Sequence, residues 1–231
     1  MARGEPDVLQ RGREEVDMLR RRVLNVVGHE LRTPVTTLRG LTDALEDAGT
    51  DAERAQITDA LVRSARRLES LVDDALVAMG VTTALPVGAP RKESVVGAVR
   101  SAWADVGGDD GLSLSGALDT TAWVPPATLG PALARVLANH LAYGDGPVEV
   151  TVASEDDRVT VHVSSAGTDL SDADLALAAE PFYRGERAVT STPGLGLGLA
   201  VASALIEHAG GSLCLARREG GGVTTIVEVP A

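Results

Sequence analysis

The sequence predicts an α+β multi-domain protein, in which an N-terminal helical hairpin dimerises into a four-helix bundle and an α/β sandwich follows. In the first third of the chain, apolar residues recur at the spacing of an amphipathic helix. In the later part they alternate at the spacing of strands, between helix-like segments. A stretch rich in Gly and Pro, "GVTTALPVGAPRK", separates the two patterns.

These patterns divide the chain into four segments. We expect residues 1–22 to form a coiled-coil-like lead-in and residues 23–80 to form the helical hairpin. Residues 81–90 are the expected linker, and residues 91–231 are the expected α/β domain.

The lead-in is predicted from a repeat of seven residues. Leu9, Val16 and Val23 recur at that spacing, and Leu19 and Val26 are offset from it by three. This is the pattern of a parallel coiled coil.

The hairpin is predicted from two apolar stripes and the turn between them. The first stripe stops at "EDAGTDAE", where Gly49 suits a helix end and Thr50 or Asp51 suits the next N-cap. The apolar face of the second helix comprises Ile57, Leu61, Leu68, Leu71, Val72, Ala75 and Met79. Two such helices cannot bury their apolar faces alone, whereas a dimer with four helices can.

Helices and short strands alternate in the last segment. We expect helices near 93–105, at 126–142, at 171–179 and after the glycine run at 194–198. Strands are expected at 112–118, 122–124, 147–154, 157–165, 211–218 and 222–230. This order predicts helices layered on one face of a mixed sheet.

The composition limits the classes of partner and the cellular location that we expect. Hydrophobic residues make up 44% of the 231 residues and aromatic residues only 2%, so the core must be built from Val, Leu and Ala. The net charge of −12 argues against nucleic acid and anionic membranes as partners. The one cysteine, Cys214, fits a reducing cytosol, and no apolar run is long enough for a membrane helix. We therefore expect a cytoplasmic protein without direct membrane insertion.

His29 stands out on the first helix of the hairpin. On a helical wheel it lies opposite the apolar stripe, and Thr33 shares its outer face. Glu30 lies at the flank, and Pro34 removes a backbone donor one turn later. An exposed imidazole beside a carboxylate can act as a nucleophile, although an ordinary surface histidine would look similar.

The stretch "HELRTP" resembles the phosphoacceptor motif of two-component sensor histidine kinases, whose core joins a HisKA-type dimerisation domain to a Bergerat-type ATPase domain. The resemblance implies that His29 receives a phosphoryl group and that Glu30 acts as its base. It further implies that Thr33 orients the water that dephosphorylates the partner. It implies a homodimer through the hairpin, and a response regulator receiver domain as partner.

The same resemblance implies a site for ATP and Mg²⁺ after residue 90. "TPGLGLGLAV" is similar to the second glycine box of the family, in which glycines let the backbone approach phosphates. "EPFYRG" is similar to the box that precedes the nucleotide lid, with Phe182 and with Arg184 and Arg187 as phosphate contacts or surface charges. The expected cofactor-binding residues are Asn139, Tyr143, Gly167, Phe182, Arg184, Gly194, Leu195, Gly196, Leu197 and Gly198.

Two boxes depart from the family pattern. Asn139 stands where the family places its magnesium ligand, but Arg135 stands where another Asn or an acid is usual. In the first glycine box, Gly167 is present, whereas Ser165 replaces the aspartate that accepts a hydrogen bond from adenine and Asp169 replaces a glycine. Loss of such a bond weakens affinity by about ten- to a hundredfold, so we expect Ser165→Asp to tighten nucleotide binding.

Three functions fit these observations. The first is a histidine kinase that phosphorylates His29 from ATP at a weakened site. The second is a phosphotransferase or pseudokinase that relays phosphate through His29, with a vestigial nucleotide domain. The third is a dimeric interaction module whose acceptor motif is unused.

Overall fold

The computed structural model describes residues 31–78, 85–108, 111–167, 170–184 and 196–231. The predicted lead-in, His29, Glu30, Gly194 and Leu195 lie outside these ranges, as do Asp169 and Arg187. The chain divides into two compact units, one ending at Ala75 and the other beginning at Leu76. Each unit is described by itself.

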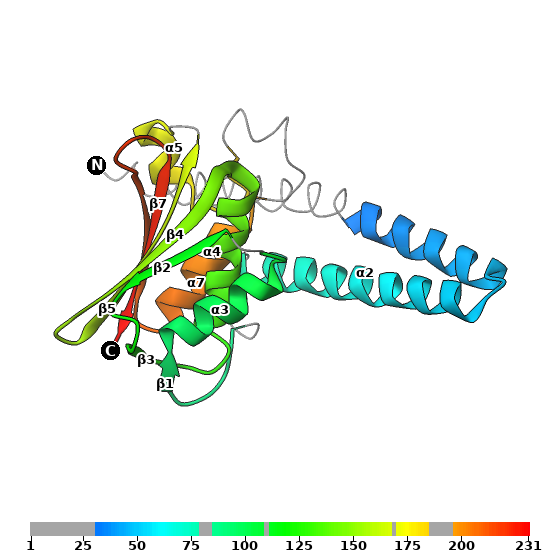
Figure 1. Ribbon diagram of the computed structural model, residues 1–231, viewed down its shortest axis with the longest axis horizontal. Helices are drawn as coiled ribbons and strands as arrows, with labels where there is room; N and C mark the ends of the chain where they lie inside the picture. The colour runs from blue at the N-terminus through cyan, green and yellow to red at the C-terminus, as the bar shows by residue number, and fades with distance from the viewer. Residues whose placement is uncertain (1–30, 79–84, 109–110, 168–169, 185–195) are drawn as a thin grey trace, which may run out of the picture. The chain divides into compact units, whose positions relative to one another are not determined.

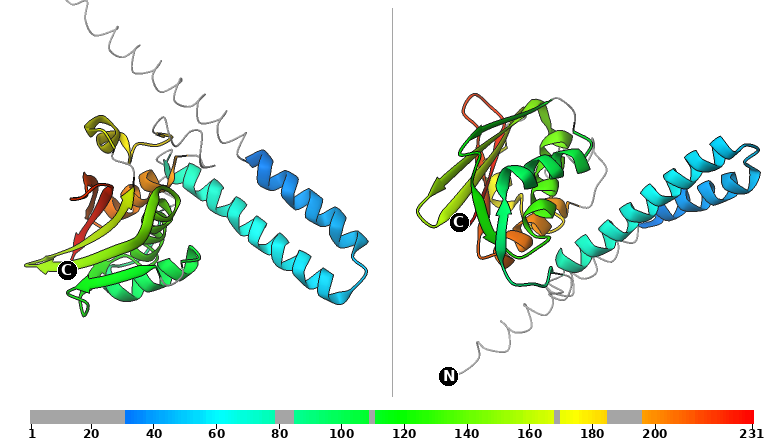
Figure 2. Two further views of the ribbon diagram at one scale, coloured as in Figure 1. Left: turned by 45° about the horizontal axis from the view of Figure 1, so that its top comes forward. Right: turned by 60° about the horizontal axis from the view of Figure 1, so that its bottom comes forward.

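The first unit is the predicted helical hairpin. Its first helix is described over residues 31–47, and α2 (Asp51–Ala78) returns beside it in antiparallel order (Figure 2). At the turn, the backbone N–H of Glu53 donates to Thr50 Oγ1 over 3.2 Å. The backbone N–H groups of Gly49 and Thr50 each donate to Glu53 Oε2 over 3.1 Å. This reciprocal arrangement is a capping box, so of the two predicted N-caps it is Thr50 that begins α2.

The apolar stripes of the hairpin are only partly covered. All described leucines of the two helices are half-buried. Val35, Val62 and Val72 are 52%, 44% and 40% exposed, and Val72 belongs to the predicted apolar face of the second helix. The chain by itself therefore leaves part of the apolar surface of the hairpin uncovered.

The second unit is built on a five-stranded sheet (Figure 1). Its strands lie in the order β2 (Leu112–Gly116), β4 (Gly144–Glu155), β5 (Arg158–Gly167), β7 (Val223–Pro230) and β6 (Ser212–Arg217). β2 runs parallel to β4, and the other neighbours are antiparallel. The mixed sheet is thus as predicted.

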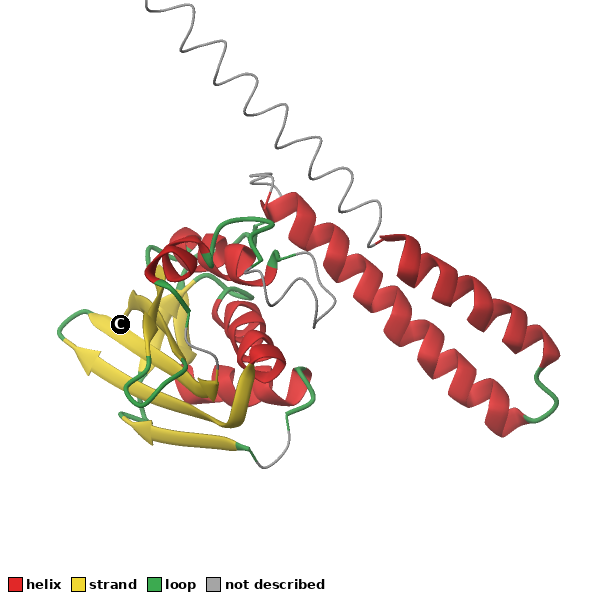
Figure 3. Ribbon diagram, turned by 90° about the horizontal axis from the view of Figure 1, so that it is seen from above, coloured by secondary structure: helices red, strands yellow, loops and turns green. Residues whose placement is uncertain are grey.

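Three helices cover one face of this sheet: α3 (Val95–Asp105), α4 (Leu129–Tyr143) and α7 (Gly198–His208) (Figure 3). α4 packs between the other two, and the short α5 (Asp172–Leu177) lies against β6. The predicted α/β sandwich is confirmed. Among the described helices, none is both long enough and apolar enough to span a membrane.

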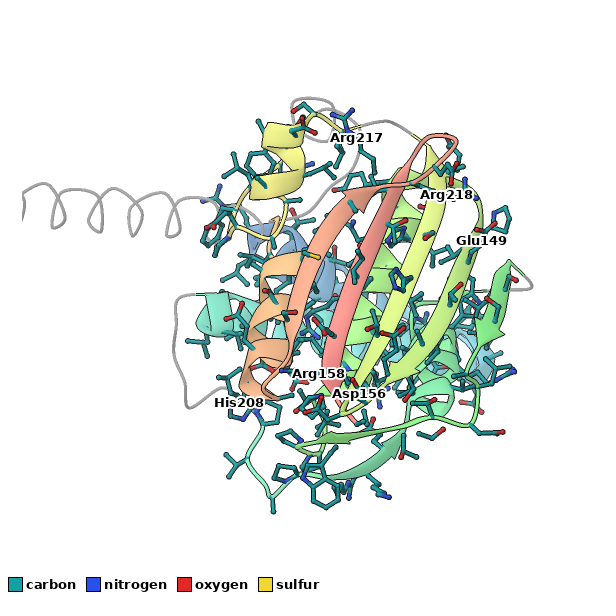
Figure 4. The ribbon with its side chains drawn as sticks, turned by 90° about the vertical axis from the view of Figure 1, so that its left-hand side faces the viewer. Glu149, Asp156, Arg158, His208, Arg217 and Arg218 are labelled. Atoms are coloured by element: carbon teal, nitrogen blue, oxygen red, sulfur yellow. The ribbon has the colours of Figure 1, made fainter. Side chains whose placement is uncertain are left out.

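The alternation of side chains explains why the sheet has one covered face. Val159, Val161 and Val163 of β5 are fully buried, whereas Thr160 and His162 between them are half-buried on the other face. That outer face carries polar groups along its strands. In Figure 4, Arg218 and Glu149 lie together there, and their side chains form an ion pair of 3.1 Å.

One strand was missed by the sequence patterns. β1 (Arg91–Ser94) pairs antiparallel with β3 (Thr121–Val124) in a separate two-stranded sheet. Its sequence, "RKES", is mostly charged and largely exposed, so it has no apolar alternation. Ser94 then caps α3, because its Oγ accepts from the backbone N–H of Gly97 over 3.1 Å.

Candidate functional site

The turn before α7 brings the backbone close to neighbouring residues. Gly196 has a φ of +68°, and a Cβ there would lie 2.6 Å from the carbonyl oxygen of Tyr183. Only glycine fits such a position. Leu197 occupies the N-cap of α7, and within the described residues it makes no side-chain hydrogen bond to the first N–H groups of the helix. This geometry suits an anion such as phosphate.

Residues 180–184 of the predicted "EPFYRG" stretch, which we call the Phe box, fold against this turn. The backbone N–H of Phe182 donates to the carbonyl oxygen of Gly196 over 3.0 Å. Phe182 itself has a φ of +65°, and Cγ of Arg184 would lie 2.9 Å from a Cβ on Gly196. The segment around Phe182 and the second glycine box, which are separate motifs in the sequence, are therefore in contact.

Asp174 ties this segment to α5. The hydroxyl of Tyr183 donates to Asp174 Oδ1 over 2.5 Å. Hydrogen bonds from the Ser171 side chain, from Tyr183 and from the Ser171 backbone, in that order, lower the pKa of Asp174. The protonated form of the Asp174 carboxyl group is thus disfavoured. The ionised carboxylate accepts hydrogen bonds from Ser171 and Tyr183 and so links α5 to the Phe box.

The C-terminal end of α4 carries the predicted nucleotide-site residues Asn139 and Tyr143. Asn139 is half-buried, and Tyr143, the last residue of the helix, is 41% exposed. The carbonyl oxygen of Tyr143 would lie 3.3 Å from a Cβ on Gly167, so these two predicted residues are neighbours. Arg135 donates to the carbonyl oxygen of Pro131 over 3.0 Å, which is an interaction within its own helix.

His140, which the sequence analysis did not select, lies at the centre of a buried polar cluster. Its Nδ1 lies 2.7 Å from Ser165 Oγ, and its Nε2 lies 3.0 Å from Thr225 Oγ1. His140 and Ser165 are each 4% exposed, and Thr225 is fully buried. Burial lowers the pKa of His140 to about 4, so the ring is neutral at pH 7. We call His140, Ser165 and Thr225 the hydroxyl–imidazole cluster.

A signal for this cluster is present in the sequence. His140 continues the buried stripe of Leu133, Val136 and Leu137 on α4. Ser165 and Thr225 each continue a run of alternating buried valines, on β5 and β7 respectively. A polar residue at the end of an apolar stripe must find a hydrogen-bond partner. Three such stripes could have predicted a shared cluster.

The two ends of the expected nucleotide site therefore differ in how well they fit. The start of α7 with Gly196 fits a phosphate group. The hydroxyl of Ser165, where the resemblance expects an adenine-reading carboxylate, is instead bonded to His140. The described residues do not fit an adenine-reading contact at Ser165.

The metal expectation rests on Asn139. No group of three or more His, Cys, Asp or Glu side chains within the described ranges could hold a metal ion. A magnesium ion at Asn139 would therefore need most of its oxygen ligands from phosphates and water.

Thr33 lies in the hairpin, and its side chain is exposed. Its carbonyl oxygen accepts a hydrogen bond from Thr37 Oγ1 over 3.0 Å. Thr33 is therefore exposed to solvent, on the outer face that the helical wheel predicts.

Comparison with known families gives two matches in one chain. Residues 19–78 match the His Kinase A (phospho-acceptor) domain. Residues 126–231 match the family described as histidine kinase-, DNA gyrase B- and HSP90-like ATPases. The two matches follow one another in the order that the sequence analysis expected.

Curated relatives are similar over most of the chain. The sensor histidine kinase MtrB of Mycolicibacterium paratuberculosis is 31% identical over 198 residues, which is 81% of this chain and 35% of MtrB. The signal transduction histidine-protein kinase BaeS of Escherichia coli is 30% identical over 94% of this chain and 48% of BaeS. The chain thus spans about a third to a half of the length of these relatives.

Solved structures share the fold. The histidine kinase AdeS of Acinetobacter baumannii matches 87% of this chain and 97% of its own, with a TM-score of 0.59 and 20% identity. Full-length ShkA, in complex with AMPPNP, matches 90% of this chain and 45% of its own, with a TM-score of 0.60 and 23% identity.

Proposed function

Because this chain belongs to the two-component histidine kinases, we propose that it is a catalytic core that phosphorylates His29 from ATP and passes the phosphoryl group to an aspartate of a response regulator. The observation that carries the proposal is the combination of a phospho-acceptor match over residues 19–78 and an ATPase match over residues 126–231. The first of these ranges contains His29.

The phosphoacceptor end follows the family motif. His29 is the nucleophile, Glu30 takes its ring proton, and Thr33 orients the water that dephosphorylates the receiver domain. Exposure of Thr33 supports this role, because a receiver domain must be able to reach it.

At the nucleotide end, ATP supplies the phosphoryl group. Gly196, Leu197 and Gly198 at the start of α7 hold the phosphates with backbone N–H groups, together with Gly194 and Leu195 before them. Arg184, which packs against Gly196, adds positive charge, and Phe182 fixes the turn through its hydrogen bond to Gly196. Asn139 provides one oxygen ligand for Mg²⁺, and Tyr143 and Gly167 border the site.

The proposed partners are a second copy of the chain and a receiver domain. The half-buried leucines and exposed valines of the hairpin support a homodimer, because pairing two hairpins would cover them.

A second function is favoured by one observation. In the hydroxyl–imidazole cluster, the hydroxyl of Ser165, which stands where the family reads adenine, is already hydrogen-bonded to His140. A phosphotransferase or pseudokinase that receives phosphate on His29 from a phosphorylated receiver domain needs no such contact.

Incubation with γ-³²P-labelled ATP and Mg²⁺, beside a His29→Ala control, separates the two functions. The kinase proposal expects acid-labile label that depends on His29. If no such label forms at millimolar ATP, while a ³²P-labelled receiver domain does label His29, the relay is correct and the kinase proposal is wrong.

A further inference from the structure

We propose that His140 determines the base specificity of the nucleotide site: its imidazole holds the Ser165 hydroxyl that would face the base, so the domain binds nucleotides through their phosphates and does not select adenine. The inference rests on the proposed function, because the resemblance places the base at Ser165. It concerns binding alone, so it can be tested whether or not His29 becomes phosphorylated.

The first argument is that both hydroxyls are already in use. The two ring nitrogens of His140 lie 2.7 Å and 3.0 Å from Ser165 Oγ and Thr225 Oγ1. A neutral imidazole has one N–H donor and one acceptor nitrogen, so one hydroxyl donates to the ring and the other accepts from it. All three side chains are sealed from solvent, at 4% exposure or less. A base could reach the Ser165 hydroxyl only if this buried cluster opened.

The second argument is that Ser165 has little room to turn elsewhere. A Cβ on Gly144 would lie 2.3 Å from Ser165 Oγ, so the backbone of Gly144 lies directly against the Ser165 side chain. His140 Nδ1 lies 2.7 Å from the same hydroxyl, so a longer side chain at this position would meet the imidazole.

This geometry changes the expectation for Ser165→Asp. The sequence alone predicts that the carboxylate would meet the exocyclic amine of adenine and tighten binding. With His140 in place, the carboxylate would meet the imidazole instead and favour its protonated form. Recovery of adenine recognition therefore requires both changes, Ser165→Asp and His140→Ala.

The unmodified chain provides the first test. Calorimetric titrations with Mg²⁺ would use ATP, GTP and inorganic tripolyphosphate as ligands. Because binding depends on the phosphates, we expect the three dissociation constants to agree within about threefold. Preference for ATP over GTP by about tenfold or more would overturn the proposal.

The second test uses variants of the full chain. We expect Ser165→Asp/His140→Ala to bind ATP about ten- to a hundredfold more tightly than the unmodified chain, with no matching gain for GTP. Ser165→Asp alone should give less than a threefold gain. The matched control is His162→Ala, because His162 lies on the other face of the same strand. It should leave all three affinities unchanged.

The variants also settle the remaining outcomes. Thermal unfolding must first show that the double variant is folded. If the double variant is not folded, the titrations of the unmodified chain alone test the proposal. If the unmodified chain binds none of the three ligands, the claim that the domain binds through phosphates is wrong, even if the folded double variant binds ATP. If the folded double variant gains no affinity for ATP, the proposal is wrong.

Discussion

The buried imidazole of His140 makes the stability of the fold depend on pH. Both of its ring nitrogens have hydroxyl partners, and its pKa is lowered from 6.5 to about 4. The folded chain therefore holds this ring neutral in a range of pH where the unfolded chain protonates it. Protonation must then favour unfolding.

We predict that the free energy of unfolding falls by about 2 kcal/mol between pH 7 and pH 5 through this one group. The sign follows from the lowered pKa: the contribution is complete above pH 6.5 and is lost as the pH falls toward 4. Urea unfolding at several pH values would measure it. His140→Gln keeps a donor and an acceptor but does not titrate. The free energy of unfolding of this variant should therefore fall by about 2 kcal/mol less between pH 7 and pH 5. Equal slopes would contradict the prediction.

At the scale of elements, the turn of the hairpin depends on two side chains. Thr50 and Glu53 satisfy the backbone N–H groups at the start of α2 reciprocally. Arg54 adds a hydrogen bond to the carbonyl oxygen of Ala48 over 3.1 Å. The reversal of the chain is therefore held by local contacts.

We predict that Thr50→Ala destabilises the first turn of α2 by about 1 kcal/mol, because the N–H of Glu53 loses its acceptor. Amide hydrogen exchange at residues 51–54 should speed up by about fivefold. Thr58→Ala is the matched control, since Thr58 is exposed and its hydroxyl bonds only to the Arg54 carbonyl within the helix. A comparable effect in both variants would show that Thr50 is not the cap.

The elements that the sequence predicted well are those with strong local periodicity. β5 and β7 alternate valines with polar residues, and α4 repeats apolar residues at helical spacing, so each was found within a few residues. β1 has no such pattern and depends on pairing with β3. The partners of His140 lie 25 and 85 residues away in sequence, and only the register of the strands brings them together.

At the scale of the whole molecule, the hairpin and the α/β unit differ in how complete they are. The α/β unit buries its own core between the sheet and three helices. The hairpin leaves the leucines of both helices half-buried and several valines exposed. The proposed dimer therefore depends on the hairpin.

We predict that Leu38→Glu converts the dimer to a monomer, because two carboxylates would have to enter the apolar seam between hairpins. Sedimentation velocity would report the mass at several concentrations. Thr36→Glu is the control, because Thr36 is exposed. It lies two residues before Leu38, so its side chain points to another face of the helix. A dimer that persists in Leu38→Glu would show that the stripe is not the interface.

The order of strands in the sheet also bears on how the α/β unit folds. β4 and β5 are joined by a short turn at Asp156 and Asp157, and β6 and β7 form a second local hairpin. Such pairs close quickly, whereas β5 and β7 must meet across a long stretch of chain. Ser165 lies on β5 and Thr225 on β7. Ser165 and Thr225 thus belong to different hairpins, so we expect the buried cluster to form only after each hairpin has closed.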